Sequence, residues 1–140
     1  MKDYLCPMKG KLFHYLGMAA AVLMIVSAYL PWIYIAPIQA TYSGMDTGTS
    51  NFGAPGILNI GLGILFLIFS LIPRIWAKRT NLFIGAAMVA WNIRNYFIFA
   101  HCEMGYCPEK KIGLYLTLIL GLLMLVAAML PYVPPSRIKR

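Results

Sequence analysis

Four long apolar stretches constrain this chain more than any other feature of its sequence. They cover residues 12–30, 56–72, 82–100 and 112–130, and each ends at a proline or at a polar or charged cluster. The hydrocarbon core of a bilayer is about 30 Å thick, so a helix needs about 20 apolar residues to cross it. The pattern therefore predicts four transmembrane helices, of which the second is the shortest.

Composition excludes a soluble domain and a disordered chain. Hydrophobic residues make up 61% and charged residues 11% of the 140 residues, against about 45–50% and about 25% in an ordinary soluble domain. A soluble domain this small buries only about two-thirds of its surface, so it could not hide these side chains from water. We expect one domain over residues 1–140, an all-α membrane protein built as a four-transmembrane-helix bundle.

The charged residues predict how the bundle is oriented. The net charge is +8, and most basic residues lie before the first span, between the second and third, or after the fourth. They are Lys2, Lys9, Lys11, Arg74, Lys78, Arg79, Arg137, Lys139 and Arg140. Because basic residues accumulate on the cytoplasmic side of membrane proteins, both termini are predicted to be cytoplasmic. Three separate clusters at helix ends indicate topology and give nucleic-acid binding no support.

Arg94 is the only full charge inside a predicted span, and charges at membrane depth are candidates for function. One interpretation is a polar pocket for an anionic headgroup or a quinone. Its candidate ligand-binding residues are Arg94, Asn95, Asn92, Asn59, Tyr96 and Trp91. The alternative is that Arg94 extends to the outer surface, or bonds carbonyl groups and Asn95 inside the bundle. The predicted spans lack Asp and Glu, so ion transport is disfavoured.

Two cysteines lie in the short second outer loop. Four residues separate Cys102 from Cys107, and Gly105 among them lets the backbone close a small ring. Outside the inner membrane the environment is oxidising, so a structural disulfide is predicted. The alternative is a thiol–disulfide relay in which His101 lowers the pKa of one thiol. Too few ligands are present for zinc, and neither a metal nor a cofactor is predicted.

Small residues repeat along the fourth span. Gly113, Thr117 and Gly121 are spaced four residues apart, a pattern that lets helices approach closely in lipid. This face is expected either to hold the bundle together or to receive a partner subunit. The first outer loop, residues 37–55, is rich in Gly, Thr and Ser, which is typical of turns and compatible with a short hairpin.

The overall layout resembles claudin-like four-span proteins, with two cytoplasmic termini, a longer first outer loop and a short second one. Leu30-Pro31-Trp32 at the end of the first span, together with residues 112–116, is also similar to small uncharacterised bacterial four-span membrane proteins. The chain departs from claudins because neither Gly-Leu-Trp nor two cysteines follow Trp32 in the first outer loop. We expect a multi-pass protein of the bacterial inner (cytoplasmic) membrane, and the resemblance implies no activity.

Taken together, these features favour a non-catalytic accessory or scaffold subunit of a larger membrane protein complex. The sequence contains no nucleophile–base pair or paired carboxylate that would favour an enzyme. One alternative is a lipid- or quinone-binding protein that uses the residues around Arg94. Another is a thiol–disulfide redox protein that uses Cys102 and Cys107. The expected partners are the bilayer, other membrane subunits and a bound lipid or quinone, and not nucleic acid.

Overall fold

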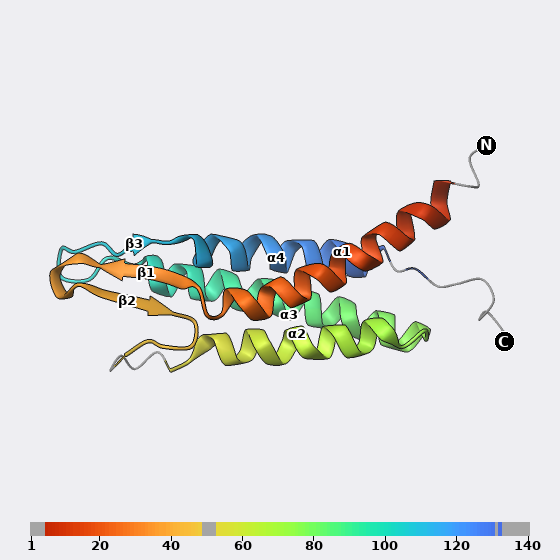
Figure 1. Ribbon diagram of the computed structural model, residues 1–140, viewed down its shortest axis with the longest axis horizontal. Helices are drawn as coiled ribbons and strands as arrows, with labels where there is room; N and C mark the ends of the chain where they lie inside the picture. Colours follow the sequence, from red (N-terminus) through yellow and green to blue (C-terminus); the bar gives the residue numbers. More distant parts are fainter. Residues whose placement is uncertain (1–4, 49–52, 131, 133–140) are drawn as a thin grey trace.

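The chain folds into a bundle of helices with a small sheet at one end (Figure 1). The computed structural model describes residues 5–48, 53–130 and 132. The helices in this part are α1 (Leu5–Ser27), α2 (Pro55–Leu71), α3 (Ile75–Ala100) and α4 (Ile112–Met129). The strands are β1 (Pro31–Ile35), β2 (Ala40–Ser43) and β3 (Glu109–Lys110), and a short 3-10 helix, η1 (Ala36–Ile38), follows β1.

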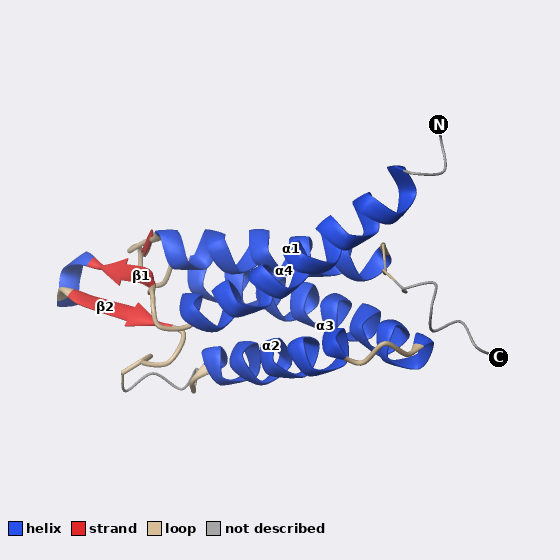
Figure 2. Cartoon of the chain, turned by 45° about the vertical axis from the view of Figure 1, so that its right-hand side comes forward, coloured by secondary structure: helices blue, strands red, loops and turns tan. Residues whose placement is uncertain are grey.

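The helices follow one another around the bundle. Each packs against its neighbours in the chain, and α4 also packs against α1. Figures 1 and 2 show the helices side by side, with the first turns of α1 leaning away from the others. The sheet stands beyond the end at which α1 and α3 finish. We name residues 31–48 and 101–111 the outer cap, after the predicted orientation, and the opposite end of the bundle the inner end.

Three of the helices are long and apolar enough to cross a membrane, namely α1 from Met8 onward, α3 and α4. The fourth, α2, is apolar but has only 17 residues. At 1.5 Å per residue its length is about 25 Å, close to the lower limit for a membrane span. Three predicted spans are therefore present as helices of sufficient length and hydropathy, and the fourth crossing stays a prediction.

The all-α prediction is incomplete, because the outer cap contains a three-stranded antiparallel sheet in the order β2-β1-β3. In the register of this sheet Ile33 of β1 lies opposite Tyr42 of β2 and Lys110 of β3. The sequence of β1 is PWIYI, and aromatic and β-branched residues favour strands. Sequence reasoning assigned Pro31 and Trp32 to the end of the first span and considered a hairpin only within residues 37–55. It therefore missed β1.

Small and flexible side chains fill the interior of the bundle. One cluster of buried residues consists of Ala20, Ala21, Met24, Phe66, Ile84, Met88, Leu120 and Met124. A Cβ atom added at Gly17 of α1 would lie 2.7 Å from the Cβ of Ala127 in α4. Small residues at such positions let helix backbones approach, which is how helices associate where lipid removes the hydrophobic driving force.

The repeated small residues of α4 face the chain's own elements. Gly113, Thr117 and Gly121 are all buried. A Cβ at Gly113 would lie 2.6 Å from the carbonyl oxygen of Pro31, and one at Gly121 would lie 3.4 Å from Nδ2 of Asn92. This face of α4 therefore packs against β1 and α3, and it is not exposed to another subunit.

Candidate functional site

Buried amides link three helices in the outer half of the bundle. Nδ2 of Asn59 in α2 donates to Oδ1 of Asn92 in α3 at 3.0 Å. Nδ2 of Asn92 in turn donates to the carbonyl oxygen of Thr117 in α4 at 3.4 Å. All three residues are buried, and buried polar groups depend on such partners. The bonds therefore tie α2, α3 and α4 together one turn or more inside their outer ends.

The same layer keeps unpaired polar atoms. Asn95 is buried one turn further along α3, and its Nδ2 has no hydrogen-bond partner among the described residues. The same holds for Oδ1 of Asn59. One buried donor and one buried acceptor thus lie on the inward faces of α2 and α3, where each can bond a water molecule or a polar group of a small ligand.

Arg94 lies apart from these asparagines. Its side chain is exposed, and its guanidinium carbon lies 5.0 Å from the centroid of the Trp91 ring. The indole of Trp91 donates to the carbonyl oxygen of Pro55, the first residue of α2, at 3.2 Å. Arg94 is therefore close to the level of the outer end of α2. Successive residues of a helix are about 100° apart around its axis. Arg94 follows Asn92 by two residues and therefore lies on a different face of α3.

Tyr96 also belongs to the outer end of the bundle. Its ring is half-buried, and Nζ of Lys110 in β3 lies 5.5 Å from the ring centroid. The candidate ligand-binding residues thus fall into two groups. The three asparagines, Asn59, Asn92 and Asn95, are buried in the bundle, whereas Trp91 and Tyr96 are half-buried and Arg94 is exposed. In the described part of the chain, a hydrogen bond joins Asn59 to Asn92, whereas Arg94 lies outside this buried layer.

The predicted disulfide between Cys102 and Cys107 is confirmed, with an S–S distance of 2.01 Å. It closes a tight hairpin in which Glu103 and Tyr106 exchange backbone hydrogen bonds of 2.9 and 3.0 Å. The two residues at the turn have positive φ angles, 49° at Met104 and 82° at Gly105, as in the two-residue turns that suit hairpins. Met104 is 99% exposed at the tip.

An apolar groove separates this disulfide hairpin from β1 and η1. Its volume is about 320 Å³. Most lining residues are apolar or aromatic, among them Ile33, Ile35, Ile38, Phe99, Met104 and Tyr106, and the polar side chains of His101 and Glu103 also line it. We name it the outer groove. Sequence reasoning missed it because it joins two loops, although the apolar run of residues 31–38 was a signal for a surface of this kind.

Buried contacts around Trp32 hold the two walls of the outer groove in place. Trp32 is fully buried, its indole donates to the carbonyl oxygen of Ser27 at 2.9 Å, and its ring meets that of Phe99 edge to face at 5.6 Å. The backbone N–H of Lys111 donates to the carbonyl oxygen of Trp32 at 2.7 Å. These contacts fix both outer loops on the ends of α1, α3 and α4.

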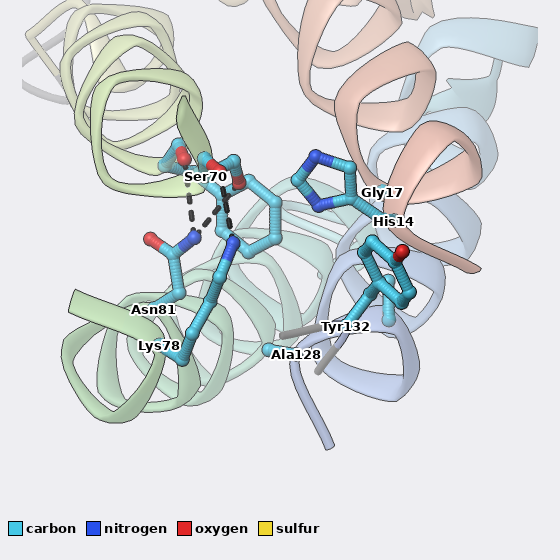
Figure 3. A pocket seen from close by; sticks show the side chains of 9 residues that line it. His14, Gly17, Ser70, Lys78, Asn81, Ala128 and Tyr132 are labelled. Atoms are coloured by element: carbon cyan, nitrogen blue, oxygen red, sulfur yellow. Dashed lines mark hydrogen bonds between the residues drawn. The ribbon is translucent and has the colours of Figure 1, made fainter. Parts of the chain in front are cut away.

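A polar pocket lies at the inner end (Figure 3). Nζ of Lys78 in α3 donates to the carbonyl oxygen of Ser70 at 2.8 Å, close to the end of α2. Nδ2 of Asn81 donates to Oγ of Ser70 at 2.8 Å. His14 of α1 and Tyr132 stand across the pocket from Lys78 in this view. Sequence reasoning treated Lys78 only as a topology signal, because these residues are far apart in the chain.

Comparison with protein-family models, with curated proteins and with solved structures yields no match to this chain. The function is therefore inferred from the geometry of the chain itself.

Proposed function

We propose that this protein is a non-catalytic subunit of a larger complex in the bacterial inner membrane, which it crosses four times with both termini in the cytoplasm. Its role in the complex is that of an accessory or scaffold subunit. The outer groove carries the proposal, because it presents an apolar surface on the part of the molecule that projects beyond the helices.

The fourth crossing is supported by the packing of α2. This helix packs along α1 on one side and α3 on the other, so it occupies the same layer as two helices of membrane-spanning length. Its outward residues are apolar and exposed, as expected of a surface in contact with lipid. They include Ile57, Leu58, Ile64, Leu65, Ile68 and Leu71. A helix of about 17 residues is sufficient for a thin or locally thinned bilayer.

The orientation is supported by the charges at the two ends. Arg74, Lys78 and Arg79 belong to the inner end, whereas the described acidic residues, Asp46, Glu103 and Glu109, all belong to the outer cap or its margin. An excess of basic residues marks the cytoplasmic side of a membrane protein. The disulfide in the outer cap fits the oxidising side.

The outer groove is a suitable contact for a partner protein. Ile38 is 60% exposed and Tyr106 is 63% exposed on its two walls. Exposed apolar surface of this kind, outside the hydrocarbon layer, marks sites of protein interaction. Because the small-residue face of α4 is used internally, we assign the contact to the outer groove. The expected occupant is an apolar side chain from an outer loop of another membrane subunit.

Native mass spectrometry after mild solubilisation from the native membrane tests this proposal. The wild-type protein should carry a second subunit, and Ile38→Asp should lose it because a carboxylate would be desolvated in the groove. Gln39→Asp is the matched control, since it adds the same charge at the adjacent, exposed position, which does not line the groove. A wild-type monomer without a co-purifying protein, or unchanged assembly of Ile38→Asp, would contradict the proposal.

Lipid binding at Arg94 is a second candidate function. The guanidinium is exposed, is placed over Trp91 and lies near the outer end of α2, where the headgroups of the outer leaflet are expected. Arginine binds phosphate groups in a planar, bidentate manner. Extraction of bound lipids from the wild type and from Arg94→Gln would test it, with loss of an anionic lipid expected in the variant. Identical lipid profiles would rule this candidate out.

A further inference from the structure

The inner end contains a crevice that the proposed role as a subunit does not use. Its volume is about 260 Å³, and it shares His14, Ser70, Lys78 and Tyr132 with the small pocket of Figure 3. Residues of α1 form one wall, and residues at the α2–α3 connection form the other. We name it the inner crevice. The first turns of α1 lean away from the bundle on this side (Figures 1 and 2).

Lys78 is held in place in the wall of the inner crevice. Its half-buried side chain donates one hydrogen bond, to the carbonyl oxygen of Ser70. Ser70 is itself fixed by Asn81, which also donates to the carbonyl oxygen of Phe66 at 3.2 Å. An ammonium group has three N–H donors. The charge of Lys78 is thus positioned by the fold with donors to spare for a ligand in the crevice.

A second lysine approaches from the opposite wall. Nζ of Lys11 in α1 lies 5.6 Å from the centroid of the Tyr132 ring, and both residues line the crevice. His14 stands one turn further along α1. The described acidic residues all lie at or near the outer cap, so in the described part of the chain these two lysines have no carboxylate partner. The inner crevice therefore carries positive charge that an anion would neutralise.

The mouth of the inner crevice is apolar. Leu71 at the end of α2 and Tyr15 of α1 line it and are 68% and 67% exposed. Both lie on the side of the bundle that faces away from its core, and this side contacts lipid in the proposed arrangement. A ligand that satisfies the crevice and its mouth together has an anionic group next to a hydrocarbon chain. Basic pockets between transmembrane helices on the cytoplasmic side bind anionic lipid headgroups.

We propose that the inner crevice binds the phosphate group of an anionic phospholipid of the inner leaflet, between Lys11 and Lys78. The acyl chains of this lipid lie against Tyr15 and Leu71. The inference rests on the proposed membrane embedding but not on the partner subunit or on the outer groove.

Lipid titration monitored by native mass spectrometry tests the inference on the full-length protein in detergent. Phosphatidylglycerol should bind more tightly than phosphatidylcholine, which has no net charge. Each lysine lost from a charge-assisted contact should weaken phosphatidylglycerol binding about tenfold. Lys11→Gln is the first variant, because Lys11 makes no described hydrogen bond that the fold would lose. Lys11→Gln/Lys78→Gln is the second.

Lys9→Gln/Arg79→Gln is the matched control. It removes the same charge from the inner end at two exposed positions that do not line the crevice. It should bind phosphatidylglycerol within about twofold of the wild type, because only nonspecific attraction is lost. Equal binding of the two lipids, or equal loss in Lys11→Gln and in the control, would overturn the inference.

A free phosphate could satisfy the same lysines, so inorganic phosphate is included as a competitor. The lipid assignment requires that excess inorganic phosphate leaves bound phosphatidylglycerol in place, and displacement would overturn it. The Ile38→Asp variant separates this inference from the proposed function. It should retain the lipid affinity of the wild type even where it loses the partner subunit.

Discussion

Backbone pairing between strands holds the outer cap together, whereas hydrogen bonds from side chains hold the inner end together. β1 pairs with β2 and β3, and a disulfide closes the loop that leads to β3. At the inner end, Lys78 and Asn81 hold Ser70 at the end of α2. A backbone ladder pairs whole segments of the chain, while each of these side-chain hydrogen bonds fixes a single point. The comparison shows a continuous paired surface at the outer cap and a polar pocket held by a few side-chain bonds at the inner end.

The two ends of the molecule also differ in charge. Acidic and basic residues mix at the outer cap, where Lys111 and Glu109 form an exposed ion pair at 3.1 Å. Such pairs contribute little to stability, and they leave the outer cap close to neutral. The inner crevice has lysines and a histidine. This contrast supports a protein partner at one end and anionic headgroups at the other.

Loss of the Trp32 side chain should have the largest effect on the outer cap. Trp32→Ala removes a fully buried ring, its hydrogen bond to Ser27 and its contact with Phe99. Truncation of a buried aromatic residue costs about 3–5 kcal/mol. Thermal unfolding of the purified protein in detergent should show a large fall in Tm. The exposed Tyr29 provides the control, and a Tyr29→Ala variant as unstable as Trp32→Ala would argue against a Trp32-centred cap.

Two glycines allow the packing at the outer end to be compared with the exposed surface of α2. Gly113→Ala would place Cβ 2.6 Å from the carbonyl oxygen of Pro31, whereas Gly61→Ala would meet no atom within 4 Å. Overpacking costs about 1–3 kcal/mol, while alanine is favoured over glycine in a helix by up to about 1 kcal/mol.

Gly113→Ala should therefore lower Tm and Gly61→Ala should raise it or leave it unchanged. Similar Tm values for the two variants would show that α4 does not press against β1 as described.

Loss of the hydrogen bonds made by the buried amides should have the smallest effect on stability. These bonds occur at both ends, so the two halves of the bundle can be compared directly. A double-mutant cycle on Asn59 and Asn92 should yield a coupling of about 0.6 kcal/mol, the average for hydrogen bonds between membrane helices, for which the maximum is about 1.7 kcal/mol. A cycle on Ser70 and Asn81 tests the equivalent bond at the inner end. Alanine is used at each position, and unfolding is followed by circular dichroism.

Both couplings should favour the native pair. Zero coupling at Asn59 and Asn92 would show that this pair does not contribute a stabilising hydrogen bond between α2 and α3.

Hydropathy predicted the helices well because a helix of membrane-spanning length needs a long, continuous stretch of apolar residues, and such a stretch is visible in the sequence. The disulfide was also predictable, since Cys102 and Cys107 are close in the chain and Gly105 relaxes the turn between them. The sheet was not, because β1 pairs with β3 across more than 70 residues, from Ile33 to Lys110. A five-residue strand at the end of a helix has too short a pattern to stand out from the apolar span before it.

The site was predicted only in part. Asn59 and Asn92 were expected to line one polar pocket, and they share a hydrogen bond. Arg94 was grouped with them because of its place in the chain, although its position two residues from Asn92 directs it to another face of α3. The inner crevice joins residues 11 and 14 to residues 70, 78 and 132. Local patterns do not predict such long-range contacts without the helix order.

Cysteine accessibility on either side of α2 tests the central claim most directly. In a chain carrying Cys6→Ser, Gln39→Cys and Arg74→Cys would each introduce one free thiol, in the outer cap or at the inner end. The cells are then exposed to a membrane-impermeant maleimide before and after the inner membrane is broken. Our account predicts that Gln39→Cys is labelled in the intact membrane and Arg74→Cys only after it is broken. Labelling of both positions from the same side would contradict a membrane-crossing α2 and the four-span arrangement.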